Sequence, residues 1–273
     1  MRLPDGRILG YAVTGDVDGP PVFYCHGWPA SRLEAGLIDD PPLRLIAVDR
    51  PGYGLSSPQS GRRIMDAAAD VAALADYLGI AVFSVIGVSG GAPYALACAA
   101  ILSRVTEVIL VSPVPPLSRR HGPRDSTLGQ SLLALRRIGE QGRLGWAVMA
   151  GIRLGIGAGL LDPQGAIDRA ASPRDAAALS PDLRTRLIGT WREGMRHGVA
   201  GAMADARIYV SDWGFDMESI TQPVTILHGT DDRGEPVATL EAYDTLRATR
   251  RLVEGEGHYS LALTRSAEMM AAL

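Results

Sequence analysis

Short apolar runs alternate with longer amphipathic stretches along much of the chain. A run of a few apolar residues predicts a buried strand, and apolar residues at helical spacing predict a helix. The predicted strands are residues 22–25, 45–48, 83–86, 107–111, 224–227 and, with a weaker pattern, 251–253. The predicted helices are residues 66–78, which end before Gly79, and residues 92–100. This alternation predicts the α/β class, with a mostly parallel sheet flanked by helices. Residues 1–7 predict a hairpin turn that leads into the extended run 8–13.

The strand pattern is interrupted between Pro113 and about Asp212, where helical segments rich in arginine take its place. We therefore expect an α/β core of residues 1–112 and 216–273, with an inserted helical lid or cap over residues 113–215. Lids of this kind sequester substrate and exclude water.

An apolar, glycine-rich stretch within this insertion, Leu144–Leu161, permits two interpretations. Its length is near that of a membrane span, and its glycines recur at every fourth position. Arg153, however, would lie near the middle of such a span, at a cost of about 3 kcal/mol. We expect a lid helix that packs over the site and lines an apolar pocket, and no membrane span.

Composition narrows the function further. The net charge of −3 disfavours a nucleic-acid partner, which would require a basic face. All 27 basic residues are arginine, so Schiff-base and Walker-type phosphate chemistry, which need a lysine, are excluded. We expect a small-molecule substrate and a monomer or homodimer. The first residues lack a signal-peptide pattern, which indicates the cytoplasm.

The two cysteines do not point to a metal or a disulfide. Cys25 falls in a predicted strand and Cys98 in a predicted helix, so both are expected to be buried apolar residues. Neither a CxxC nor an HExxH spacing occurs. We expect no metal and no cofactor.

The segment Gly87-Val88-Ser89-Gly90-Gly91 lies where a predicted strand gives way to a predicted helix. A Gly-x-Ser-x-Gly at such a junction is a nucleophile elbow, in which the serine occupies a strained backbone conformation and the glycines leave room for the turn. The alternative is a glycine-rich turn with an incidental serine. Ser89 is the candidate nucleophile.

Three further motifs each follow a predicted strand. They are His26-Gly27-Trp28-Pro29, Gly229-Thr230-Asp231-Asp232 and Glu256-Gly257-His258. Together with the elbow they give the chain order serine, carboxylate, histidine, which is that of the α/β-hydrolases. The chain resembles this superfamily, and within it the lidded serine-hydrolase branch with HGxP and GxSxG motifs. The resemblance covers about residues 3–112 and 216–271.

The resemblance implies a role for each motif. His258 is the general base that takes the proton of Ser89, and a carboxylate holds its imidazole. The family spacing Gly-x-x-Asp favours Asp232 for that carboxylate, with the adjacent Asp231 as the alternative. The backbone N–H groups of Trp28 and Gly90 form the oxyanion hole. The Trp28 ring either lines the substrate pocket or packs in the core.

The remaining polar residues near these motifs are expected to be structural. Asp49 suggests a turn, and His26 and His228 suggest hydrogen bonds within tight turns. His121 and His197 fall in the insertion and are expected at the surface. Arg32 and Glu34 are expected to form a bracing or solvated pair.

The identity of the nucleophile limits the reaction. The epoxide-hydrolase-like and dehalogenase-like branches carry an aspartate at the elbow, whereas a serine suits attack on a carbonyl through an acyl-enzyme. We expect a serine hydrolase for a small to medium apolar ester or lactone. Thioesters and activated carbon–carbon bonds also fit. The alternatives are a non-hydrolytic lyase, acyltransfer or cyclisation enzyme with the same triad, and a ligand-binding protein with an unused triad.

Overall fold

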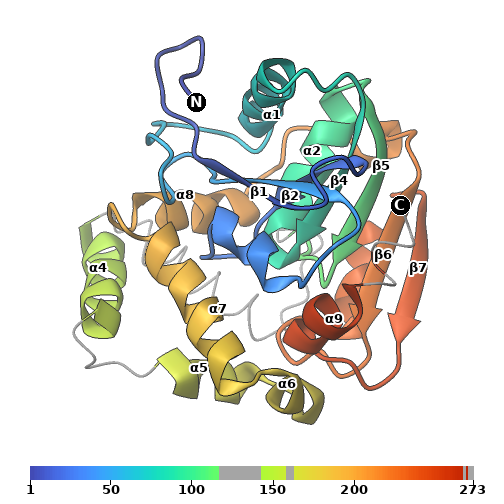
Figure 1. The fold of residues 1–273 in the computed structure, drawn as a ribbon. Helices are drawn as coiled ribbons and strands as arrows, with labels where there is room; N and C mark the ends of the chain where they lie inside the picture. Colours follow the sequence, from blue (N-terminus) through green and yellow to red (C-terminus); the bar gives the residue numbers. More distant parts are fainter. Residues whose placement is uncertain (117–142, 158–162, 267–268, 270–273) are drawn as a thin grey trace.

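A seven-stranded sheet forms the centre of the protein in the computed structural model (Figure 1). The structure describes residues 1–116, 143–157, 163–266 and 269. The strand order is β1-β3-β2-β4-β5-β6-β7, and only the β1–β3 pair is antiparallel. The strands are β1 (Tyr11–Gly15), β2 (Pro21–Cys25), β3 (Arg44–Val48), β4 (Phe83–Val88), β5 (Val105–Val111), β6 (Val224–Gly229) and β7 (Ala248–Val253).

Helices cover the sheet and extend beyond one of its ends. Those associated with the sheet are α1 (Asp66–Tyr77), α2 (Ala92–Ile101) and α9 (His258–Thr264). Between β5 and β6 the described residues contain α4 (Arg143–Gly157), α5 (Pro163–Ala170), α6 (Pro173–Ala178), α7 (Pro181–Gly194) and α8 (Ala200–Tyr209). Short 3-10 helices occur as η1 (Arg32–Leu37), η2 (Ser89–Gly91), η3 (Met217–Ser219) and η4 (Val237–Tyr243).

The apolar strands form two core layers because their side chains alternate between the faces of the sheet. In β2, Phe23 and Cys25 pack on the face that carries α1 and α2, whereas Val22 and Tyr24 pack on the opposite face. The inner strands are buried on both faces, which explains their continuous apolar runs. Cys98 belongs to the first layer, and both cysteines are buried and free, as predicted.

The expected α/β class with a mostly parallel sheet is confirmed, and each of the six predicted strands is present. The weak pattern at 251–253 belongs to an edge strand, β7, whose arginines are exposed. At the N-terminus, Arg2 and Ile8 form an antiparallel bridge, so the predicted turn is present. The regular strand after it begins only at Tyr11, because β1 pairs with β3 from that residue onward.

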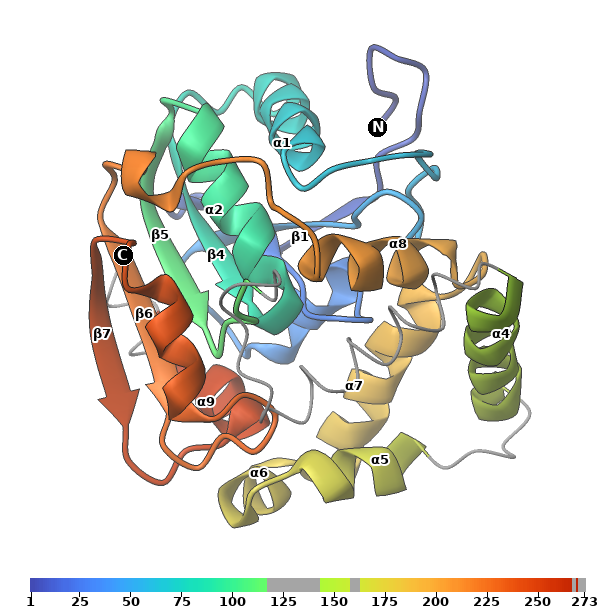
Figure 2. The same ribbon diagram turned by 180° about the vertical axis from the view of Figure 1, so that it is seen from behind.

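The helices between β5 and β6 lie toward the carboxyl ends of the strands (Figures 1 and 2). In this interval the described residues contain no strand. Helix α7 packs on η1, α6 packs on α9, and α4 packs on α8. Within the described part of the chain, no helix combines the length and the apolar character needed to cross a membrane. Residues 158–161 of the apolar stretch, and His121, lie outside the described residues.

Candidate active site

The elbow after β4 adopts the strained turn that its glycines predict. Ser89 has a φ of +49°, in the left-handed region that residues with a side chain rarely occupy. A Cβ on Gly91 would lie 1.9 Å from the carbonyl oxygen of Cys25, so the start of α2 can cross the end of β2 only without a side chain there. The serine is thereby fixed at the point where the strand turns into the helix.

The loops after β6 and β7 bring a carboxylate and a histidine together. His258 Nδ1 lies 2.9 Å from Asp232 Oδ2, and the second oxygen of Asp232 accepts the backbone N–H groups of Gly234 and Glu235 at 2.9 and 2.8 Å. The neighbouring Asp231 is exposed, and its backbone N–H donates to Glu256. Of the two adjacent aspartates, only Asp232 contacts the imidazole.

The charges of this pair stabilise each other. Burial of the imidazole lowers the pKa of His258, but the carboxylate of Asp232 and those of more distant acids raise the pKa by more, to about 9. Burial raises the pKa of Asp232, but the attraction of His258 and the other contacts lower it by more, so the net pKa lies below its ordinary value. The imidazole is therefore held by a carboxylate that stays ionised.

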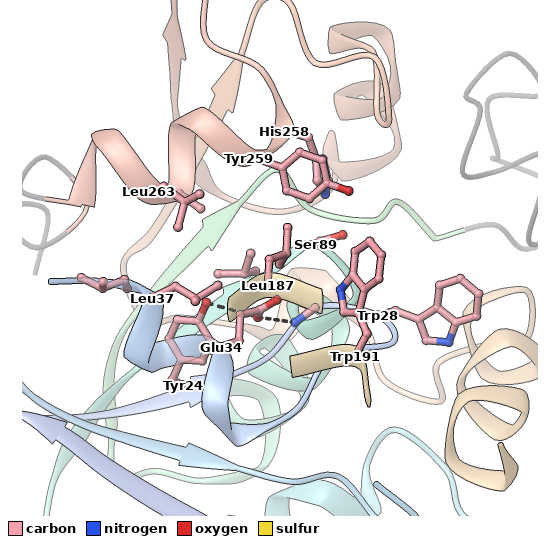
Figure 3. A pocket seen from close by; sticks show the side chains of 14 residues that line it. Tyr24, Trp28, Glu34, Leu37, Ser89, Leu187, Trp191, His258, Tyr259 and Leu263 are labelled. Atoms are coloured by element: carbon pink, nitrogen blue, oxygen red, sulfur yellow. Dashed lines mark hydrogen bonds between the residues drawn. The ribbon is translucent and has the colours of Figure 1, made fainter. Parts of the chain in front are cut away.

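Ser89 and His258 line one cavity together with Trp28 (Figure 3). It holds roughly 600 Å³ of empty space, its open mouth included. Its other lining residues are mostly apolar or aromatic: Tyr24, Gly27, Glu34, Leu37, Ile38, Val88, Leu187, Trp191, Tyr259, Ala262 and Leu263.

The loop after β2 lies directly against the elbow. A Cβ on Gly27 would stand 3.7 Å from Ser89 Cβ, and a Cβ on Gly90 would stand 2.9 Å from Trp28 Cβ. The Trp28 indole lines the cavity, and its Nε1 donates to the carbonyl of Ala202 on α8 at 3.0 Å. The Trp28 ring therefore both lines the cavity and packs against buried core residues, so the two alternatives considered from the sequence are combined.

A buried carboxylate on α8, Asp205, connects the helices between β5 and β6 with this loop. It forms ion pairs with Arg50 and Arg62 and accepts the hydroxyls of Tyr53 at 2.7 Å and Tyr94 at 2.6 Å. Burial raises the pKa of Asp205, but the two guanidinium groups lower it by more, so the carboxylate is ionised.

The same network reaches the backbone on both sides of Ser89. Arg50 donates from its two terminal nitrogens to the carbonyl oxygens of His26 and Gly27, the latter at 3.0 Å. Tyr209, at the end of α8, lies 3.2 Å from Asp205 and donates its hydroxyl to the carbonyl of Gly90 at 2.8 Å. The two backbone segments flanking Ser89 are thus fixed by one charge cluster.

A second buried carboxylate, Asp175 on α6, holds the histidine loop. It accepts the backbone N–H groups of His258, Tyr259 and Ser260 at 3.2, 2.9 and 2.6 Å, so it caps the free N-terminus of α9. It also forms a capping box with Ser172. The sequence pattern Ser-x-x-Asp at 172–175 marks the start of α6, but it does not reveal this second contact.

The other polar residues singled out in the sequence are mainly structural. Asp49 accepts the backbone N–H groups of Arg32 and Leu55, which fixes the turn after β3. His26 and His228 are buried and contact carbonyl oxygens of nearby residues, at 2.8 and 2.7 Å. His197 is exposed, as expected. In the described residues, no group of three or more His, Cys, Asp or Glu side chains is arranged to hold a metal ion.

Two expectations were wrong. Arg32 and Glu34 do not pair with each other, because Arg32 forms ion pairs with Asp49 and Glu193, and Glu34 accepts the N–H of Gly27 in the cavity. The helix expected over 144–161 does not line the cavity in its described part, α4. Leu187 and Trp191 of α7 form that wall, because α7 packs on η1, whereas α4 packs outside α8.

The chain is similar to known proteins in sequence and in fold. A model of the family described as alpha/beta hydrolase fold matches residues 20–263. A non-heme chloroperoxidase of Streptomyces lividans is 31% identical over 87% of this chain and 83% of its own length. A bifunctional esterase/perhydrolase of Acinetobacter calcoaceticus is 30% identical over 86% and 83%. A bromoperoxidase structure from Bacillus anthracis superposes with a TM-score of 0.69 and 20% identity, over 96% and 93% of the two chains.

The Asp205 network generates a stability prediction. Asp205→Asn removes the negative charge between two buried arginines, so we expect the free energy of unfolding in urea to fall by about 3–5 kcal/mol. Asp244→Asn, which breaks the exposed pair with Arg250, is the control and should cost no more than about 1 kcal/mol. Equal, small losses in both variants would show that the cluster does not hold the fold together.

Proposed function

The chain belongs to the α/β-hydrolase family, and we propose that it is a serine hydrolase that cleaves a small to medium apolar ester or lactone through an acyl-enzyme. The observation that carries the proposal is the shared cavity of Ser89 and His258, with Asp232 bound to the Nδ1 of that histidine. The relative named as a bifunctional esterase/perhydrolase supports acyl chemistry in general.

In the first half of the reaction, Ser89 Oγ attacks the carbonyl carbon of the substrate. Nε2 of neutral His258 takes the hydroxyl proton, and Asp232 stabilises the imidazolium that forms. The tetrahedral oxyanion accepts hydrogen bonds from the backbone N–H groups of Trp28 and Gly90, whose segments lie side by side. The alcohol then leaves with the proton from His258.

In the second half, water attacks the acyl carbon of the Ser89 ester. His258 takes the proton of the water, and the acyl–Oγ bond breaks as that proton returns to Ser89. Arg50 and Tyr209 are positioning residues in this scheme. They fix the carbonyl oxygens of the two segments that carry the oxyanion donors.

The cavity supports the proposed substrate class. Leu37, Leu187 and Leu263 offer apolar contacts beside Ser89, and Trp28 and Trp191 add aromatic surface. Such walls favour a compact apolar acyl or alcohol group. A lactone fits the same scheme, because its leaving hydroxyl stays attached to the acyl group.

We further propose that residues 113–215 act as a helical cap on a core of residues 1–112 and 216–273. The contacts of Asp175 and Asp205 with the core support this division. The cytoplasmic location and the monomeric or homodimeric state stay predictions.

Perhydrolysis is a second candidate, favoured by the relatives named as chloroperoxidase and esterase/perhydrolase. It is one form of the acyl transfer considered from the sequence. Hydrogen peroxide would replace water, break the acyl–Oγ bond and yield a percarboxylic acid, and its proton would return to Ser89 through His258.

Replacement of the nucleophile should stop the reaction. Ser89→Ala should abolish covalent labelling by a fluorophosphonate and lower ester turnover by roughly 10⁴–10⁶-fold, since the triad residues act as a unit. Ser112→Ala, which changes a buried serine just after β5, is the control and should still be labelled. Unchanged labelling of Ser89→Ala would remove this serine from the mechanism. If neither labelling nor turnover occurs in the wild type, the triad is unused, which contradicts the hydrolase proposal.

The acid should control both the rate and its pH dependence. Only neutral His258 can act as a base, and its pKa of about 9 places the rising limb of kcat/KM around pH 9. Asp232→Asn should lower turnover by about 10³–10⁴-fold. It should also move the limb to lower pH, because the charge that raises the pKa is gone.

Asp231→Asn is the matched control for this experiment, because its side chain is exposed. Its pH profile should coincide with that of the wild type. A larger loss at Asp231 than at Asp232 would move the acid by one residue.

Water and hydrogen peroxide can be compared directly as acceptors of the acyl group. With ethyl acetate and excess hydrogen peroxide, a perhydrolase would form peracetic acid in a reaction that Ser89→Ala eliminates, as measured by mass spectrometry. Acetic acid as the sole acyl product, alongside ethanol, would leave hydrolysis as the reaction.

A further inference from the structure

Glu34 is a second carboxylate in the cavity, separate from the His258–Asp232 pair. It lies on η1 and is half-buried among mostly apolar and aromatic walls. Within the described residues, Oε2 of Glu34 accepts two hydrogen bonds. The donors are the backbone N–H of Gly27 at 2.6 Å and the hydroxyl of Tyr24 at 3.2 Å. One oxygen therefore braces the loop after β2.

The other oxygen of Glu34 faces the space beside the nucleophile. A Cβ on Gly27 would lie 3.1 Å from Glu34 Oε1 and 3.7 Å from Ser89 Cβ, so both groups border the same small volume (Figure 3). A substrate carbonyl under attack by Ser89 Oγ would place its nearest substituents within reach of Oε1.

The positive charges near this carboxylate act on it without an ion pair. Among the described residues, no arginine or histidine forms an ion pair with Glu34, and the adjacent Arg32 is engaged by Asp49 and Glu193. Burial raises the pKa of Glu34, and this effect exceeds the opposing effects of the Gly27 N–H, of Arg50, of the Tyr24 hydroxyl and of His258. A hydrogen-bond donor that enters the cavity would stabilise the ionised form.

We propose that Oε1 of Glu34 binds a hydrogen-bond donor, a hydroxyl or an ammonium group, carried by the substrate within a few bonds of the carbonyl that Ser89 attacks. This inference rests on the proposed hydrolase function and narrows its substrate class. The preferred substrate is then apolar over most of its surface but carries one donor near the reacting carbonyl. Glu34 acts as a specificity-determining residue.

The experiment compares three methyl esters of similar size: methyl butyrate, methyl 3-hydroxybutyrate and methyl 3-aminobutyrate. A pH-stat measures kcat/KM for each with the wild type and with Glu34→Gln. Since a hydrogen bond to a charged group is strong, we expect at least one donor-bearing ester to exceed methyl butyrate by about tenfold or more. The ester that gains identifies the donor as hydroxyl or ammonium.

Glu34→Gln separates recognition from support of the loop. Its amide oxygen can still accept the Gly27 N–H, but its NH₂ group would face the substrate. The ratio of donor-bearing ester to methyl butyrate should fall about tenfold. A purely structural role would lower all three rates by one factor and leave the ratio unchanged, which would overturn the proposal. Asp231→Asn, an exposed carboxylate outside the cavity, should keep the wild-type ratio.

Two further measurements keep the test independent of folding and of turnover. If Glu34→Gln does not fold, the absence of any donor preference in the wild type overturns the proposal. Calorimetry in the Ser89→Ala background measures binding of the same esters without reaction. If the Ser89→Ala protein binds a donor-bearing ester more tightly than methyl butyrate, and Glu34→Gln removes this preference, the role of Glu34 is supported even if no ester is hydrolysed. Equal binding of all three esters contradicts the proposal.

Discussion

The arrangement around Ser89 depends on the ion pairs and hydrogen bonds of one buried carboxylate, Asp205. An ionised carboxylate inside a protein is stable only when ion pairs and hydrogen bonds replace its hydration. Asp205 obtains them from Arg50, Arg62 and tyrosine hydroxyls that arrive from different segments. Each partner must therefore be in place for the others to be satisfied. The same groups also hold backbone carbonyls beside Ser89, so the cost of burying the charge and the geometry of the site are linked.

Asp175 plays the corresponding part on the opposite side of the cavity. It caps α9 and so fixes the backbone at His258, whereas Asp205 acts on the loop after β2 and on the elbow. Both carboxylates come from helices between β5 and β6, and both bind groups of the sheet-forming part of the chain. These helices do more than cover the cavity, because they complete the hydrogen bonding of the loops that border it.

The sheet and the motif-bearing loops were predictable because their signals are local. A buried strand is an apolar run, and the strained turn at Ser89 needs glycines within two residues of it. Glycine spacing also pointed to the aspartate that contacts His258. Arg50 and Asp205, by contrast, are 155 residues apart in the sequence, and no local pattern joins them. Leu144–Leu161 misled because an apolar stretch does not show which surface its helix meets, and in α4 large apolar side chains such as Leu144, Trp146 and Leu154 are exposed. Glu34 was paired with its neighbour Arg32, although its partners come from the preceding strand and loop.

Helix α7 differs from its neighbours in how it meets the cavity. It contributes Leu187 and Trp191 to the wall, whereas the buried carboxylates that fix the loops around Ser89 and His258 belong to α6 and α8. Substitutions on this one helical face can reshape the wall without touching either carboxylate. A substitution on this face that conserves the buried volume of Leu187 would therefore change the shape of the wall while Asp175 and Asp205 keep their partners.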